Sequence, residues 1–145
     1  MLTAAGVEAL LKVKEQKLAD PDSLVMYTFR DPFGATCIAG QLILNEYGVE
    51  KLEEAEKEVF GCRKVASSIL GIHFKRWGEE GSETDSIFYK QDWDTDSLFY
   101  KQDWDTDLFD RWQRSTSSEE RAQIVAEVID RFISKYYNEE EQNAD

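Results

Sequence analysis

The chain has one histidine, His73, and two cysteines, Cys37 and Cys62, among 145 residues. Two cysteines are too few for a secreted disulfide framework, and their separation fits neither a zinc site nor a redox pair. One imidazole without a second histidine or a neighbouring cysteine lacks the spacing of metal ligands. We therefore expect two reduced, buried thiols, no cofactor and a location in the cytoplasm.

Long apolar runs and catalytic motifs are also absent. No segment approaches the roughly 18 apolar residues that a membrane-spanning helix needs, and Glu8 interrupts the apolar stretch near the N-terminus, unlike a signal peptide. Neither a G-x-S-x-G elbow nor a phosphate-binding glycine pattern occurs. A helix N-terminus could lower the pKa of Cys37, but its neighbours Ile38 and Ala39 favour a small buried residue. The sequence predicts neither an enzyme nor a membrane protein.

Positive charge is scarce in the second half. The formal net charge is -13; residues 1–76 hold 11 acidic and 10 basic side chains, whereas residues 77–145 hold 19 and 7. A negative field repels nucleic acid and anionic membranes and speeds the encounter with a basic partner. We expect a protein partner with a basic surface, or self-association, and no direct nucleic-acid binding.

What the chain does have is an 11-residue tandem repeat. Residues 85–95 read DSIFYKQDWDT and residues 96–106 read DSLFYKQDWDT, so that only Ile87 and Leu98 differ, and a partial third start follows at 107–112. Such similarity indicates a recent or deliberate duplication. We expect one copy to pack on the core and the other to leave apolar surface for a partner, for a second molecule or for repacking. The predicted binding residues are Phe88, Tyr89, Trp93, Phe99, Tyr100, Trp104, Asp92, Asp94, Asp103 and Asp105.

Four aspartates of the repeat have the spacing of a calcium loop. Asp92, Asp94, Asp96 and Asp103 occupy its positions 1, 3, 5 and 12, where carboxylates surround the cation. Position 6, however, is Ser97 rather than glycine, and position 12 lacks the bidentate glutamate. Solvated carboxylates in turns are the favoured interpretation, and a calcium site is the weaker one.

Helical periodicity dominates the rest of the chain. Thr3 can cap a helix over 4–17. Three further helices are predicted over 37–47, 49–60 and 63–70, and each ends at a glycine. Thr36 can cap the first of these three. Residues 24–29 alternate like a strand before a turn at 31–34. Because one strand cannot form a sheet, this segment either pairs with an unidentified partner or is merely extended. Residues 71–84 have the composition of a loop. A capping box at Thr116 or Ser117 opens a final helix, whose apolar stripe runs from Ala122 to Tyr136.

Within the repeat, we expect each copy to form a short helical turn, capped by Asp85 or Asp96, with the DWDTD stretches as turns. The predicted fold is mainly α. It is a compact single-domain helical bundle of about five to six helices over residues 1–137, with at most one short extended segment. Residues 138–145 form a polar, frayed tail.

Three motifs resemble a family of small, uncharacterised bacterial and phage proteins. The matches are Cys37-Ile38-Ala39-Gly40 to its C-G-T-x-x-C-I-A-G pattern, Ile69-Leu70-Gly71 to its helix end, and Leu98-Phe99-Tyr100 with Trp104 to its L-F-x-x-x-x-W element. The resemblance covers residues 33–133, and Phe33 stands where the family has its first cysteine. It implies a C-terminal amphipathic helix and brings no activity with it.

Three hypotheses about function follow. The first is a non-enzymatic, acidic protein-interaction module, such as an inhibitor or accessory protein of a phage or mobile element. In a special case of this module Asp92, Asp94, Asp103 and Asp105 imitate phosphates. The second is a protein that binds or sequesters a small molecule or nucleotide in a pocket near Cys37 to Gly40 and the aromatic element. The third is a chain designed to test a sequence duplication.

Overall fold

Helices make up most of the protein. The computed structural model describes residues 2–72 and 95–137. The elements in order are α1 (Ala4–Ala19), the 3-10 turn η1 (Pro21–Ser23), α2 (Ile38–Tyr47), α3 (Val49–Glu56), α4 (Gly61–Leu70), α5 (Asp96–Phe99), the 3-10 turn η3 (Lys101–Asp103), α6 (Thr106–Arg114) and α7 (Ser118–Tyr136). Most of the predicted 71–84 loop, His73, the repeat up to residue 94 and the 138–145 tail lie outside the described residues.

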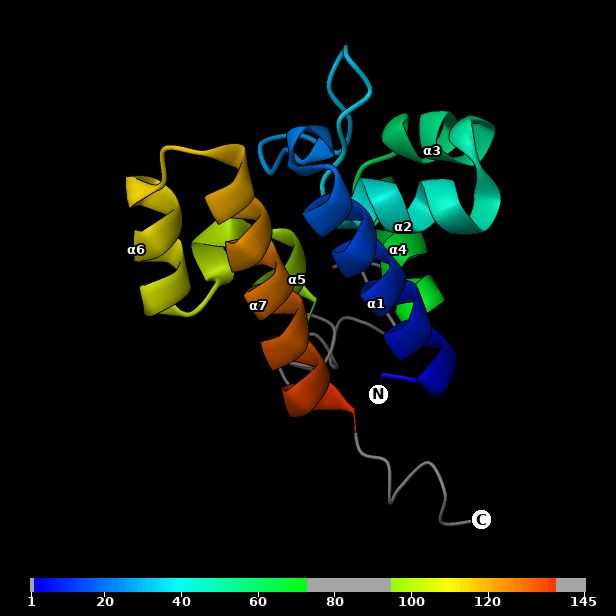
Figure 1. Cartoon of the computed structure of the whole chain (residues 1–145). Helices are drawn as coiled ribbons and strands as arrows, with labels where there is room; N and C mark the ends of the chain where they lie inside the picture. The colour runs from blue at the N-terminus through cyan, green and yellow to red at the C-terminus, as the bar shows by residue number, and fades with distance from the viewer. Residues whose placement is uncertain (1, 73–94, 138–145) are drawn as a thin grey trace.

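The helices pack as one body. α1 contacts α7, α4 and α2, while α2 also packs on α3 and α4, and α6 lies against α7. In Figure 1, α6 and α7 lie on one side and α1 to α4 on the other, with α5 between the two groups. The mainly helical fold is confirmed. The described residues hold seven α-helices rather than the five or six predicted.

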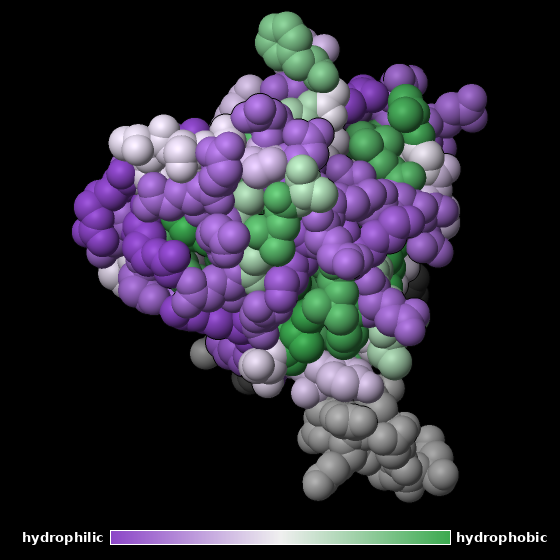
Figure 2. Space-filling view, in the orientation of Figure 1, coloured by the Kyte–Doolittle hydropathy of each residue, from purple (hydrophilic) through white to green (hydrophobic). Residues whose placement is uncertain are grey.

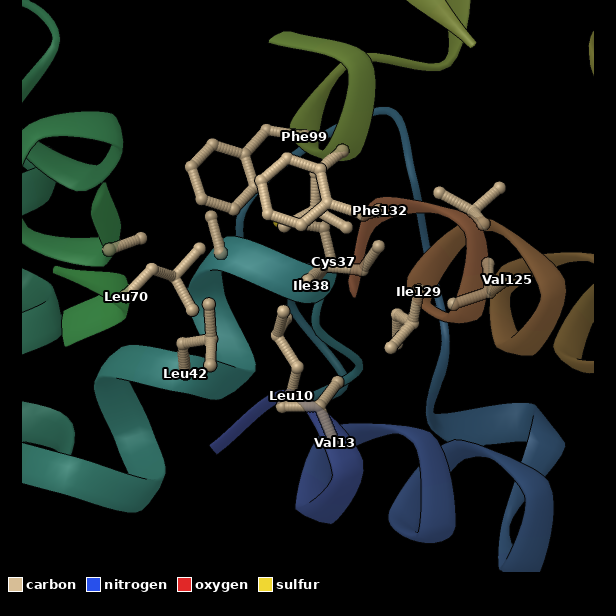
Figure 3. Close-up of a cluster of buried hydrophobic side chains, with 14 of the residues drawn as sticks. Leu10, Val13, Cys37, Ile38, Leu42, Leu70, Phe99, Val125, Ile129 and Phe132 are labelled. Atoms are coloured by element: carbon tan, nitrogen blue, oxygen red, sulfur yellow. The ribbon is translucent and has the colours of Figure 1, made fainter. Parts of the chain in front are cut away.

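Side chains from all seven described α-helices contribute to the core, part of which is drawn in Figure 3. Each fully buried aliphatic or aromatic side chain contributes on the order of 1.5–3 kcal/mol to folding. Residues 2–72 and residues 95–137 both contribute side chains to the core, so the core joins the two halves of the chain. The labelled core residues are Leu10, Val13, Cys37, Ile38, Leu42, Leu70, Phe99, Val125, Ile129 and Phe132.

Two of the predicted helix caps are present and two differ. The hydroxyl of Thr3 accepts from Gly6 N, and that of Ser117 from Glu120 N. The prediction that Thr36 caps α2 is wrong: Cys37 occupies the cap, where its Sγ accepts a hydrogen bond from Gly40 N at 3.4 Å. The hydroxyl of Thr36 instead binds a buried lysine. The predicted Asp96 cap is also wrong, because α5 begins at Asp96 itself.

The helix boundaries in the middle of the chain shift by a few residues. α3 ends at Glu56 rather than at Phe60. Phe60 itself takes the left-handed φ of 60°, which an α-helix does not include. α4 begins at Gly61 rather than at Arg63. α6 was not predicted; it forms because Leu108 and Trp112, one turn apart, both reach the core.

The predicted strand at 24–29 does not form. Instead the 24–36 segment folds back on itself through single β-bridges that join Leu24 and Arg30 to Thr36. The backbone of Phe29 lies against Gly40, where a Cβ would come within 2.1 Å of the Phe29 carbonyl oxygen. Glycine at position 40 therefore permits the segment to pack on α2.

Candidate functional site

The second repeat copy lies largely inside the core. Phe99 and Trp104 are buried and Tyr100 is half-buried. The ring of Trp104 packs edge-on against Trp112 with centroids 5.4 Å apart, and its Nε1–H donates to the Leu98 carbonyl at 3.3 Å. Among the predicted binding residues, Phe99 and Trp104 thus serve as core side chains, as expected for the copy that packs on the core. Phe88, Tyr89, Trp93, Asp92 and Asp94 lie outside the described residues.

The aspartates of the second copy do not gather around a common point. Asp96 pairs with the buried Arg63, whose Nη2 lies 2.5 Å from its Oδ1. Burial raises the pKa of Asp96, while the Arg63 charge opposes that rise. Asp103 is exposed, and Asp105 binds an arginine of α7. Within residues 2–72 and 95–137 no group of three or more histidine, cysteine or acidic side chains could hold a metal ion.

Arginines neutralise part of the acidic surface on α6 and α7. Arg131 binds Asp105 at 3.0 Å, Asp107 at 2.7 Å and Glu127 at 2.9 Å, and Arg111 binds Glu127 as well. The hydrogen bond from Arg131 lowers the pKa of Asp107, and the one from Arg111 contributes most to lowering the pKa of Glu127. A carboxylate such as Asp105 is already paired, which weakens the hypothesis that it imitates a phosphate.

A buried lysine holds the 24–36 segment in place. Lys17 is 1% exposed, and its ammonium donates to Ser23 O at 2.6 Å, Thr36 Oγ1 at 2.7 Å and Gln41 Oε1 at 3.0 Å. These acceptors come from η1, from the end of the segment and from α2, so that one side chain ties three elements to α1. Burial lowers the pKa of Lys17 to about 8. No sequence motif marks Lys17, although it lies on the same buried face of α1 as Leu10 and Val13.

A rigid turn exposes one aromatic side chain. Asp31 Oδ1 accepts from Phe33 N and Ala35 N, both at 2.9 Å, and the Asp31 and Ala35 backbones are joined at 2.8 Å. Gly34 supplies the positive φ of 91° that the turn requires. Phe33 is 94% exposed at the tip, and the segment projects from the helical body (Figure 1). The protein thus holds a large apolar group in water on an ordered backbone.

Apolar and acidic side chains alternate on α3 and its flanking turns. We call the exposed residues from 46 to 60 the α3 face. Residues 49–60 contain five glutamates and two lysines. Figure 2 shows hydrophobic surface among hydrophilic surface over α3 and over the projecting segment. The exposed apolar residues of the face are Tyr47, Val49, Val59 and Phe60.

The projecting turn and the α3 face adjoin one another. Arg30, at the base of the turn, lies 3.0 Å from Glu56 and 3.8 Å from Glu53 of α3. Arg30, Asp31, Gly34 and Glu56 line an open hollow of about 440 Å³ between the two. The base of the turn that carries Phe33 is therefore joined to the α3 face through Arg30.

A second hollow lies where the 24–36 segment meets the second repeat copy. It measures about 300 Å³ and is lined by residues 26–29, Cys37 and residues 99–102. Cys37 and Phe99 are buried in its floor, and residues 100–102 are more exposed. The sequence hypothesis placed a pocket near Cys37 and the aromatic element, where this hollow lies.

Both cysteines are buried free thiols. Burial raises the pKa of Cys37 to about 11 and that of Cys62 to about 12. The bond from Gly40 N lowers the pKa of Cys37, but burial outweighs it. Of the two interpretations of Cys37, the inert buried residue fits this environment, because a nucleophilic thiol must ionise readily.

Comparison of the chain with protein-family models, with curated proteins and with solved structures found no match. Within the described residues no helix is long and apolar enough to cross a membrane.

Proposed function

We propose that the protein is a non-enzymatic interaction module that acts in the cytoplasm and binds a basic protein partner. The observation that carries the proposal is Phe33, 94% exposed on a hydrogen-bonded turn beside an acidic helix. A large exposed aromatic group has no folding benefit, whereas aromatic side chains dominate the energetics of interfaces. The resemblance to bacterial and phage proteins extends the proposal to an inhibitor or accessory protein of a mobile element.

The charge of this surface selects the partner. The five glutamates and two lysines of residues 49–60 leave a local excess of negative charge. Such a surface attracts a basic partner and repels another copy of itself. This favours a basic partner over self-association through the same face. The proposed contact surface therefore lies in the first half of the chain. It does not lie on the second repeat copy, because Phe99 and Trp104 are buried there.

The turn is suited to this role because it is ordered before binding. The two bonds to Asp31 Oδ1 and the Lys17 bonds fix the 24–36 segment in the free protein. A preordered anchor loses little conformational entropy on binding, which favours affinity. Phe33 therefore acts as the anchor, and the carboxylates of the α3 face guide the approach of the partner.

The test compares two exposed aromatic residues. Partners captured by the wild-type chain are purified and titrated against wild type, Phe33→Ser and Tyr47→Ser by calorimetry at two salt concentrations. Phe33→Ser should weaken binding by about tenfold or more, since truncation of an anchor costs about 2 kcal/mol. Tyr47→Ser, also on an exposed aromatic residue, should have a smaller effect, and higher salt should slow association. A partner that is acidic, or that binds Phe33→Ser with unchanged affinity, would contradict the proposal.

A further inference from the structure

The hollow at Cys37 has an apolar floor and aromatic residues around it. Met26, Cys37 and Phe99 form the floor and are each at most 8% exposed. A flat ring packs well against other aromatic rings and against a thioether sulfur such as that of Met26. The composition of the lining therefore favours an aromatic ligand. The aromatic residues that line the hollow are Tyr27, Phe29, Phe99 and Tyr100.

The described lining of the hollow holds one charged side chain, and its charge lies elsewhere. This side chain is Lys101, whose ammonium lies 5.9 Å from the ring of Trp112 in α6, a residue outside the lining. The thiol of Cys37 stays neutral, because burial raises its pKa to about 11. A charged ligand would lose hydration in this hollow without gaining a counter-charge, which favours an uncharged one.

Both walls of the hollow are fixed by contacts within the protein. The wall of residues 26–29 belongs to the segment that Lys17 ties to α1 and α2. In the same wall, the carbonyl of Phe29 accepts a hydrogen bond from the backbone N–H of Cys37 at 3.3 Å. The opposite wall, at residues 99–102, follows α5, which the Arg63–Asp96 pair joins to α4. Since both walls are ordered without a ligand, binding would require little conformational change.

The volume of the hollow and its uncharged polar groups narrow the choice of ligand further. A volume of about 300 Å³ is at the low end for ligand sites, which favours a molecule of fragment size over a nucleotide. Thr28, Tyr100 and Gln102 add two hydroxyls and one amide to the residues of the lining. A few such groups around an apolar base are the usual means by which a site orients its ligand.

We propose that this hollow is a binding site for a small, uncharged aromatic molecule with one hydrogen-bonding group. The ring lies on the floor of Met26, Cys37 and Phe99, and its polar group faces the hydroxyl and amide side chains of the lining. The site is independent of the proposed function, because neither Phe33 nor any residue of the α3 face lines the hollow. Either one can therefore fail without the other.

The test compares benzamide with three molecules of similar size. Benzoate and benzamidine carry an anion or a cation on the same ring, and cyclohexanecarboxamide keeps the amide but lacks the flat ring. Each probe is titrated into the 15N-labelled full chain, and the backbone amide signals of residues 26–29, 37 and 99–102 are followed. The variants are Tyr27→Ser, in the lining, and the matched control Tyr47→Ser, outside it. These tyrosines are 75% and 55% exposed, so neither replacement disturbs the core.

Benzamide should shift these signals to saturation and bind about fivefold more tightly than each of the other three probes. Tyr27→Ser should weaken benzamide binding by about threefold, the loss expected for one aromatic contact, and Tyr47→Ser should leave it unchanged. The absence of a saturable shift with benzamide, or binding of any other probe as tight as that of benzamide, would overturn the proposal. Equal effects of the two variants would overturn it as well.

Discussion

Truncation of Trp104 tests whether the second repeat copy is the one that fills the core. Trp104 is 5% exposed, packs edge-on against Trp112 and donates to the Leu98 carbonyl. Removal of a buried tryptophan costs about 3–5 kcal/mol of folding free energy. In a domain of this length, we expect Trp104→Ala to lower Tm by roughly 10 °C.

The repeat supplies its own control. Trp93 has the same neighbours in sequence as Trp104, but the site beside Trp112 holds one indole at a time. Trp93→Ala should therefore cost less than about 1 kcal/mol. Urea unfolding followed by far-ultraviolet circular dichroism measures both variants without relying on the fluorescence of the tryptophan that was removed.

Equal costs for the two variants would refute this reasoning, as would a cost below about 1 kcal/mol for Trp104→Ala. A third result would also refute it: each single variant lowers the free energy of unfolding only slightly, whereas the double variant lowers it strongly. The two copies would then replace one another in the core, and the non-additivity would measure that exchange.

Three further predictions concern buried polar groups. Lys17→Met should lower the free energy of unfolding, measured with urea, by about 2–3 kcal/mol because it leaves buried acceptors without a donor. Lys14→Met, at a surface ion pair, should lower it by less than about 1 kcal/mol. Similar losses for the two variants would argue against the structural role of Lys17. Asp96→Asn should destabilise by about 1–3 kcal/mol because it removes the charge of a carboxylate that pairs with the buried Arg63. Asp85→Asn, at the equivalent position of the first copy, should be close to neutral, and thermal unfolding would show the opposite order if the first copy filled the site. Burial raises the pKa of Cys37 from the ordinary 9.0 to about 11, so between these pH values the folded protein keeps a proton that the unfolded chain loses. The free energy of unfolding of the wild type should therefore fall as pH rises through that window, and Cys37→Ala should reduce this fall by on the order of 2 kcal/mol. An unchanged slope in Cys37→Ala would mean that the thiol ionises normally.

The helices with clear periodicity and caps could be predicted from the sequence. Thr3 and Ser117 identify the starts of α1 and α7, because their hydroxyl oxygens accept the backbone N–H three residues on, at Gly6 and Glu120. Thr36 also looks like a cap, but tertiary structure recruits its hydroxyl to Lys17 and leaves the cap to Cys37. Local rules fail at Thr36 because a buried ammonium outcompetes a backbone amide for its oxygen.

The candidate site was harder to predict because exposure depends on the whole fold. The aromatic residues of the repeat look like exposed anchors in an acidic segment, yet Phe99 and Trp104 enter the core. Phe33 looks like an ordinary turn residue, yet it is almost fully exposed. The segment at 24–29 has the alternation of a strand, yet within residues 2–72 and 95–137 it makes only isolated bridges and joins no sheet. The presence of a neighbouring strand cannot be known from the segment alone.

The burial of the second repeat copy has an evolutionary consequence. Residues 96–104 meet the demands of the interior through Asp96, Leu98, Phe99 and Trp104. Purifying selection for folding therefore acts directly on this peptide, whatever its role in binding. A substitution at Leu98 or Trp104 would be removed because it lowers the amount of folded protein.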